Sequence, residues 1–107
     1  MPVADVLRRS FATALALEQM TPALARIPGI DWQERVGTTE GRYLRGLTPN
    51  GVKIRLVAVA PRWLAEIHFP IGPGWTRFTD AEKTGFAEWV RSAVLAAIEA
   101  TDLRDEP

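Results

Sequence analysis

Alternating apolar and polar residues predict a β-hairpin in the second half of the chain. Residues 52–60 (VKIRLVAVA) and 63–69 (WLAEIHF) are both typical of strands. If Pro61 and Arg62 form a two-residue turn between them, one face is continuously apolar, pairing Ala60 with Trp63, Ala58 with Ala65, Leu56 with Ile67 and Ile54 with Phe69. The opposite face then carries Val57, Val59 and Leu64 beside Lys53, Arg55, Glu66 and His68.

Two further extended segments, residues 30–36 and 42–47, precede this hairpin. The pattern leaves open whether residues 30–36 pair with the sheet or lie across its edge. Residues 48–51 (TPNG) are a strong turn signal, because Asn-Gly adopts positive φ at little cost. A two-residue turn there would place Tyr43 and Leu47 on the apolar face together with Arg45. A three-residue loop would instead turn Leu44 inward, and both registers stay open.

Helical patterns are expected at both ends of the chain. Residues 4–20 carry apolar side chains at spacings of three and four, with Asp5 as a possible cap, and a short helical piece over residues 22–27 follows. Residues 70–78 are rich in Pro and Gly and are expected to form a loop. Thr79 and Glu82 match a capping box for a helix ending near residue 101, and residues 102–107 are expected to be a polar, frayed tail.

These elements predict a single α+β domain over residues 1–107. Its expected order is an N-terminal helix, an antiparallel sheet of three or four strands and a C-terminal helix (α-β-β-β(-β)-α). Two helices can cover only one face of such a sheet, so we expect both on the face of Ile54, Leu56 and Ile67. The other face keeps some apolar residues exposed, which favours a homodimer.

Composition narrows the class of protein. The chain has 107 residues, of which 47% are hydrophobic and 24% charged, and 13 basic residues balance 13 acidic ones. This excludes a disordered chain and disfavours a polybasic membrane binder. The sequence contains no cysteine, no signal-peptide pattern and no apolar run near the roughly 18–20 residues of a membrane span. A cytoplasmic location with no membrane partner is therefore expected.

Residues typical of catalysis or cofactor binding are scarce. His68 is the only histidine, and only Glu66 lies at strand spacing beside it, which is a poor metal-ligand set. Ser10 and Ser92 lack a nucleophile elbow, and the glycines of residues 72–74 lack the lysine of a phosphate loop. We therefore expect no metal, no cofactor and no enzymatic activity.

Charge distribution supplies candidate binding residues. Residues 42–62 contain five bases and no acid, namely Arg42, Arg45, Lys53, Arg55 and Arg62. Such a basic stretch either contacts nucleic-acid phosphates or is a solvated strand face balanced by acids elsewhere. Trp75 in the Gly/Pro loop, together with Val57, Val59 and Leu64, is the candidate surface for a protein partner.

The turn at residues 48–51, the strands at 52–56 and 63–69 and the capped helix through residues 89–94 resemble the YbaB/EbfC family of bacterial nucleoid-associated proteins. The similar stretch runs from residue 45 to about residue 100. The resemblance implies a homodimer that binds DNA with little sequence preference. The alternative hypothesis is a protein–protein adaptor, such as a secretion chaperone, an immunity protein or a phage-borne inhibitor. A third is a small-molecule pocket lined by Trp32, Trp63 and Trp89.

Overall fold

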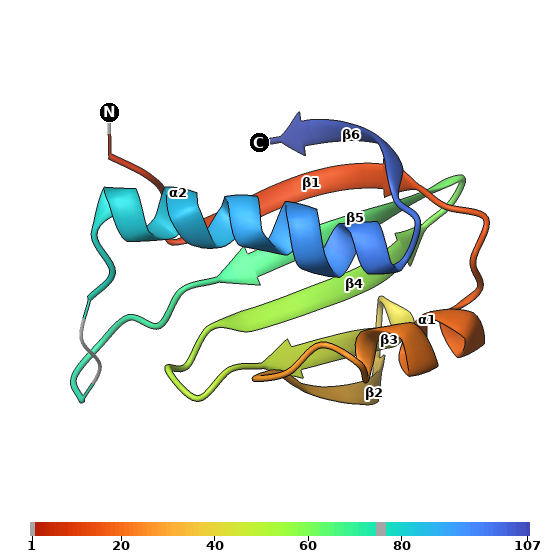
Figure 1. The fold of residues 1–107 in the computed structure, drawn as a ribbon, viewed down its shortest axis with the longest axis horizontal. Coiled ribbons are helices and arrows are strands. Elements are labelled where there is room, and N and C mark those ends of the chain that lie inside the picture. Colours follow the sequence, from red (N-terminus) through yellow and green to blue (C-terminus); the bar gives the residue numbers. More distant parts are fainter. Residues whose placement is uncertain (1, 75–76) are drawn as a thin grey trace.

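A computed structural model describes residues 2–74 and 77–107 of the chain. It contains a six-stranded antiparallel sheet in the order β2-β3-β4-β5-β1-β6 (Figure 1). The strands are β1 (Val6–Ala12), β2 (Asp31–Gly37), β3 (Gly41–Leu47), β4 (Lys53–Val59), β5 (Arg62–His68) and β6 (Thr101–Glu106). The helices are α1 (Leu17–Leu24) and α2 (Asp80–Trp89), and α2 continues into a π-helical segment, η1 (Val90–Leu95). The fold is therefore α+β.

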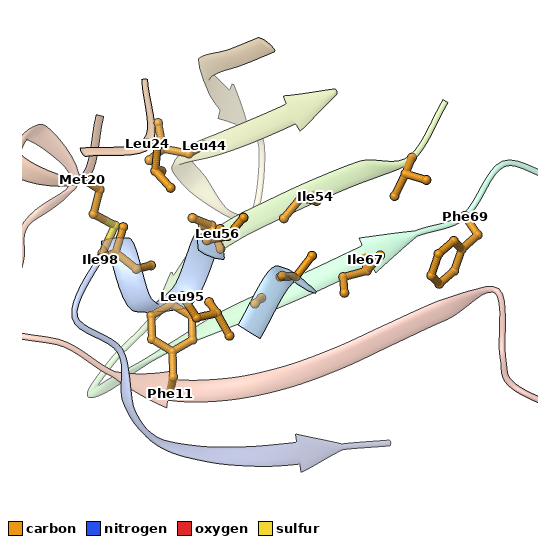
Figure 2. Packing of buried hydrophobic residues seen from close by; sticks show 14 residues of the cluster. Phe11, Met20, Leu24, Leu44, Ile54, Leu56, Ile67, Phe69, Leu95 and Ile98 are labelled. Carbon is orange, nitrogen blue, oxygen red and sulfur yellow. The ribbon is translucent and has the colours of Figure 1, made fainter. Parts of the chain in front are cut away.

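The helices pack on the same face of the sheet and form one hydrophobic core with it (Figures 1 and 2). From the helical side, Met20 of α1 lies close to Ile98, just beyond η1, and Leu24 of α1 lies close to Leu44 of β3. From the sheet, the core receives alternate residues of its central strands, including Leu44, Ile54, Leu56, Ile67 and Phe11. The opposite side of the sheet carries no helix among the described residues. We call this side the uncovered face.

The prediction of a helix over residues 4–20 is wrong. Residues Val6–Ala12 form β1, which pairs with β5 on one side and β6 on the other. Leu7 and Phe11 are four residues apart, so they share a face in a strand as well as in a helix. The sheet decides between the two, because both neighbouring strands supply backbone hydrogen bonds to β1. The helix begins only at Leu17, and it includes Pro22 rather than ending before it.

The expected element order and strand number also need correction. The order begins with a strand, not a helix, and the sheet has six strands rather than three or four. Residues 30–36 do belong to the sheet, because β2 pairs along its whole length with β3. The C-terminal residues are not a frayed tail, since Thr101–Glu106 form β6 at the sheet edge beside β1.

The hairpin registers follow from the loop lengths. Leu44 pairs with Leu56 and is fully buried, so the three-residue alternative for the loop after β3 holds. Between β4 and β5, Val59 pairs with Arg62, which makes Ala60 and Pro61 the turn residues. This register differs by two residues from the expected one, with Ile54 opposite Ile67 instead of Phe69. A shift of two preserves which side chains point inward, so the predicted apolar face is correct.

The start of α2 is as the sequence predicts. The Thr79 hydroxyl accepts a hydrogen bond from the Glu82 amide at 3.1 Å, and the Glu82 carboxylate accepts one from the Thr79 amide at 2.8 Å. These bonds satisfy two backbone donors that the helix start leaves without intrahelical partners. No helix in the described ranges has the length and apolar character needed to span a membrane.

Because residues 6–12 form a strand that packs into the core, we predict how substitutions there change the free energy of unfolding. Phe11 has 0% exposure in the core, so F11A should lower the free energy of unfolding by about 3–5 kcal/mol. Val36 is 79% exposed on edge strand β2, and V36A should change the free energy of unfolding by less than about 0.5 kcal/mol. Urea unfolding followed by circular dichroism measures both. Equal effects of the two substitutions would contradict the packing described for β1.

Candidate functional site

The uncovered face carries one polar residue from every strand in a single row across the sheet. The strand registers place side by side Gln33 of β2, Arg45 of β3, Arg55 of β4, Glu66 of β5, Arg8 of β1 and Glu106 of β6. We call these six residues the central row. Cross-strand neighbours of this kind are close enough to interact directly. Three arginines and two glutamates therefore lie along one line of an otherwise open sheet.

Glu66 is the centre of the ionic contacts in this row. It is 7% exposed, and its carboxylate accepts a hydrogen bond from Arg8 Nε at 2.8 Å. Arg55 Nη1 lies 3.1 Å from the other carboxylate oxygen, and His68 Nε2 lies 3.5 Å from it. Arg55 also reaches Glu40 at 3.1 Å and stacks over the Tyr43 ring at 4.7 Å. The buried negative charge is thus held by two guanidinium groups.

The pKa values of Glu66 and His68 follow from this arrangement. Burial acts to raise the Glu66 pKa, but the hydrogen bonds from Arg8 and His68 and the charge of Arg55 outweigh it and hold the pKa below its usual value. Burial lowers the pKa of His68, and the nearby Glu66 carboxylate offsets this only in part. Glu66 is therefore ionised and His68 neutral at neutral pH.

Three of the five predicted nucleic-acid residues are engaged in ion pairs. Arg55 pairs with Glu40 and Glu66, as described above. Arg62 lies on the uncovered face and pairs with Asp102 of β6 at 2.8 Å. Arg42 points to the helix side of the sheet, where it pairs with Glu18 of α1 at 2.9 Å and with Glu34 of β2. The acids come from other parts of the chain, so the stretch that is free of acids in sequence is not free of them in space.

The other two predicted residues, Arg45 and Lys53, form no ion pair with any described residue. Arg35 of β2 has the same property and lies on the same face, a position that the sequence analysis did not single out. Arg35 and Lys53 each lie one diagonal step from Arg45, because Arg45 is opposite Gln33 on β2 and Arg55 on β4. We call Arg35, Arg45 and Lys53 the basic diagonal. Diagonal neighbours on a sheet are about 7–8 Å apart.

The sequence would have identified Arg35 as a candidate binding residue only if the register of β2 against β3 had been known. Alternation alone places Arg35 and Trp32 on different faces of β2. Only the pairing of β2 with β3 shows that Arg35 lies beside Arg45. The Gln33 side chain accepts hydrogen bonds from Arg35 at 2.8 Å and from Arg45 at 3.4 Å. This amide orients both guanidinium groups, and its nitrogen donates to Asp31 on the same face at 3.4 Å, although neither arginine forms an ion pair with Asp31.

The candidate protein-partner residues are exposed to different degrees. Val57 is only 6% exposed, Leu64 is partly buried, and Val59 near the β4–β5 turn is 54% exposed. Val57 lies between Tyr43 of β3 and Leu64 of β5, its neighbours across the sheet. Among the described residues, Val59 and Leu47 of β3, which is 41% exposed, are the large apolar side chains that this face exposes most to a partner. Trp75, the fourth candidate, lies outside the described residues.

Neither metal binding nor similarity to known proteins supplies a role for this face. Within residues 2–74 and 77–107, no group of three potential ligands is placed to hold a metal ion. No protein-family model matches the chain, and no curated protein matches it in sequence. The resemblance to the YbaB/EbfC family stays a prediction. The strands and the C-terminal helix on which the resemblance rests are present in the structure, while the N-terminal residues 6–12, expected to be helical, form β1.

The ionic cluster around Glu66 predicts acid sensitivity. A carboxyl with a lowered folded-state pKa stabilises the protein above its unfolded pKa of about 4.3, and this contribution is lost as pH falls below that value. E66Q should therefore lower the free energy of unfolding by about 1–3 kcal/mol at pH 7, because two guanidinium groups lose their partner.

The difference between E66Q and the unsubstituted protein should shrink as the pH falls through about 4. His68, whose pKa is also lowered, adds a loss of stability as pH falls below its usual pKa of about 6.5, and H68Q separates the two contributions. Chemical denaturation at a series of pH values measures both. A difference that stays constant down to pH of about 3 would show that folding does not lower the pKa of Glu66.

Proposed function

We propose that this protein is a non-enzymatic binding protein that holds a polyanion, with nucleic acid as the favoured class, on the uncovered face. The observation that supports the proposal is the basic diagonal of Arg35, Arg45 and Lys53. These three cations lie on adjacent strands of one face and have no acidic partner among the described residues. The proposal includes a cytoplasmic location, which the sequence pattern favours.

The charge on one part of the uncovered face, and not the net charge of the chain, supports this proposal. The whole chain is formally neutral, so a long-range positive field does not draw a polyanion to it. On the β2–β4 half of the uncovered face, however, Arg55 already has its acids, and the basic diagonal adds three cations that form no ion pair, with Asp31 as a nearby acid on the same face. Arginine and lysine at such spacing suit phosphate groups, with arginine able to bind in a bidentate manner.

The chemistry of this surface favours binding without sequence specificity. Phosphate contacts fix position on a nucleic acid but carry no information about base sequence. The sheet presents its cations on a broad face and not on a protruding helix that could enter a major groove. This is also what the resemblance to nucleoid-associated proteins implies.

A titration of duplex DNA at several salt concentrations tests the proposal. Three phosphate contacts should give a slope of log affinity against log salt near −2.7, by the rule of about −0.9 for each contact. The triple substitution R35Q/R45Q/K53Q should remove most of the binding and flatten the slope. R42Q is the matched control, because Arg42 points to the helix side of the sheet, and it should bind like the unsubstituted protein.

Two results would overturn the nucleic-acid assignment. One is the absence of binding at low salt, and the other is equal loss of binding in R42Q and in the triple variant. Circular dichroism of each variant shows whether the fold is kept. A single-stranded RNA of equal length in the same titration distinguishes the two kinds of nucleic acid.

The second candidate function is a protein–protein interface, first of all between two copies of this chain. Val59 favours it, because this valine is 54% exposed on the uncovered face. A partner that covers it would also cover the turn at Ala60 and Pro61 and the nearby Arg62. Burial of this patch is the physical basis for the expected homodimer.

Light scattering after size-exclusion chromatography tests this interface. The expected result is a dimer that V59D converts to a monomer, because the substitution places an unpaired charge in the interface. V36D is the control, since Val36 is 79% exposed on edge strand β2 and points to the other side of the sheet. A monomer at every concentration, or equal effects of both substitutions, would remove the homodimer from the proposal.

A further inference from the structure

On the helix side of the sheet, a groove runs between the α2–η1 helix and strands β1 and β6. It has a volume of about 430 Å³. Its apolar lining comes from three directions, with Leu7 on β1, Ala65 and Ile67 on β5, and Ala87, Val90 and Leu95 on the helix. None of the tryptophans that the sequence suggested for a pocket, Trp32, Trp63 and Trp89, lines this groove. In Figure 1 the helix runs alongside β1 and β6 on the side nearest the viewer.

One part of the groove opens into a polar hollow. The hollow shares Arg9 and Asp105 with the groove and is completed by Arg91 and Leu103. Arg9 Nε donates a hydrogen bond to Asp105 at 2.9 Å, and the Asp105 side chain is 86% exposed. The groove thus joins an apolar floor to a polar opening with two guanidinium groups.

The other charged residues near the groove are already engaged or lie apart from Arg9. Glu88 also lines the groove, and its carboxylate lies 3.9 Å from Arg91. Arg8 and Glu106 border the groove, but they are held on the uncovered face by Glu66 and Ser10 at 2.8 and 2.7 Å. The cation that faces the groove from the sheet is therefore Arg9, with Asp105 as its partner.

The helix wall of this groove has an irregular backbone. Val90 and Leu95 are the first and last residues of the π-helical segment η1, and both line the groove. π-Helical turns inside α-helices are rare and occur frequently at functional sites. This is an observation independent of the apolar lining, and it concerns the same surface.

We propose that the groove binds an amphiphile with one apolar chain and one anionic end group. The chain lies along Leu7, Ile67 and Val90, and the end group lies between Arg9 and Arg91 in place of the Asp105 carboxylate. The volume falls within the range of roughly 300–1,000 Å³ that small-molecule sites have. Asp105 shows the chemistry that Arg9 accepts, because a carboxylate already bonds to its guanidinium group.

An exposed internal carboxylate is an easily displaced partner. Asp105 is mostly in water, so it loses little when a ligand carboxylate or phosphate takes its place at Arg9. A fatty acid and a single-chain lipid phosphate share this chemistry. The two are distinguished by the probes of the experiment.

Isothermal titration with dodecanoate and dodecyl phosphate below their micelle concentrations, and with dodecanol below its solubility limit, tests the proposal. The expected order is that both anions bind at least about tenfold more tightly than the alcohol, since only they form charge-assisted hydrogen bonds with arginine. R9Q should weaken binding of the anions several-fold toward the level of dodecanol, because only Arg91 then remains beside the end group. D105N should strengthen it several-fold, because the competing internal carboxylate is gone.

Matched controls separate the groove from the rest of the surface. R104Q alters an exposed arginine of β6 that belongs to the uncovered face, and it should leave all three affinities unchanged. A87L fills the groove and should weaken binding of every probe, the alcohol included. A87W repeats this with a larger side chain, and circular dichroism checks that both variants fold.

Three results would overturn this proposal. Equal affinities for dodecanol and the two anions would remove the role of the arginines. Weaker binding to D105N would show that Asp105 is not displaced, and unchanged binding to A87L would place the ligand elsewhere. Tighter binding of one anion identifies the headgroup. All outcomes are independent of the DNA titration, because the basic diagonal lies on the other face of the sheet.

Discussion

The period of two in strand β1 places consecutive arginines on opposite faces of the sheet. Arg8 points to the uncovered face and holds Glu66, while Arg9 points to the helix side and holds Asp105. Both contacts require β1 to lie between β5 and β6, since one supplies Glu66 and the other Asp105. Strand β1 therefore contributes Arg8 to the central row and Arg9 to the groove, while the basic diagonal lies on β2, β3 and β4. In a helix, residues 8 and 9 would point about 100° apart and could not serve two faces.

One-sided coverage of the sheet explains the polar character of the uncovered face. An antiparallel sheet with one face in water carries polar side chains on that face, and here charged residues share it with apolar ones along β4 and β5. Val57 is 6% exposed although no helix covers it, and it lies between Tyr43 and Leu64 of the neighbouring strands. Arginine side chains on the same face also repel one another unless acids are placed between them. Glu40, Glu66 and Asp102 fill these places beside Arg55 and Arg62.

Local chemistry made part of this structure readable from the sequence. The Thr79–Glu82 capping box needs only residues three positions apart, and the alternation in β4 and β5 fixes which side chains point inward even when the register shifts by two. The pattern of β1 was ambiguous, because Leu7 and Phe11 satisfy both a strand and a helix. Only pairing with distant strands β5 and β6 resolves it.

The candidate site was harder to predict for the same physical reason. A run of bases free of acids in sequence says nothing about acids brought in by folding, and Glu66, Glu40 and Asp102 all come from outside residues 42–62. Arg35 was missed because its neighbour across the sheet, Tyr43, and its diagonal neighbour, Arg45, belong to another strand. Ion pairing depends on strand register. Alternation along a strand fixes which face a side chain is on, but it does not distinguish registers that differ by two residues.

The two faces can act separately because β6 is attached by several kinds of contact. If an anion replaces Asp105 at Arg9, the strand still keeps its backbone ladder with β1, the Ser10–Glu106 hydrogen bond and the Arg62–Asp102 ion pair. The last two lie on the uncovered face, so they are not touched by a ligand in the groove. Glu66 likewise keeps Arg8 and Arg55 whichever carboxylate Arg9 holds. Because neighbouring side chains of one strand point to opposite faces, a single strand can contribute to two sites without coupling them through side-chain contacts.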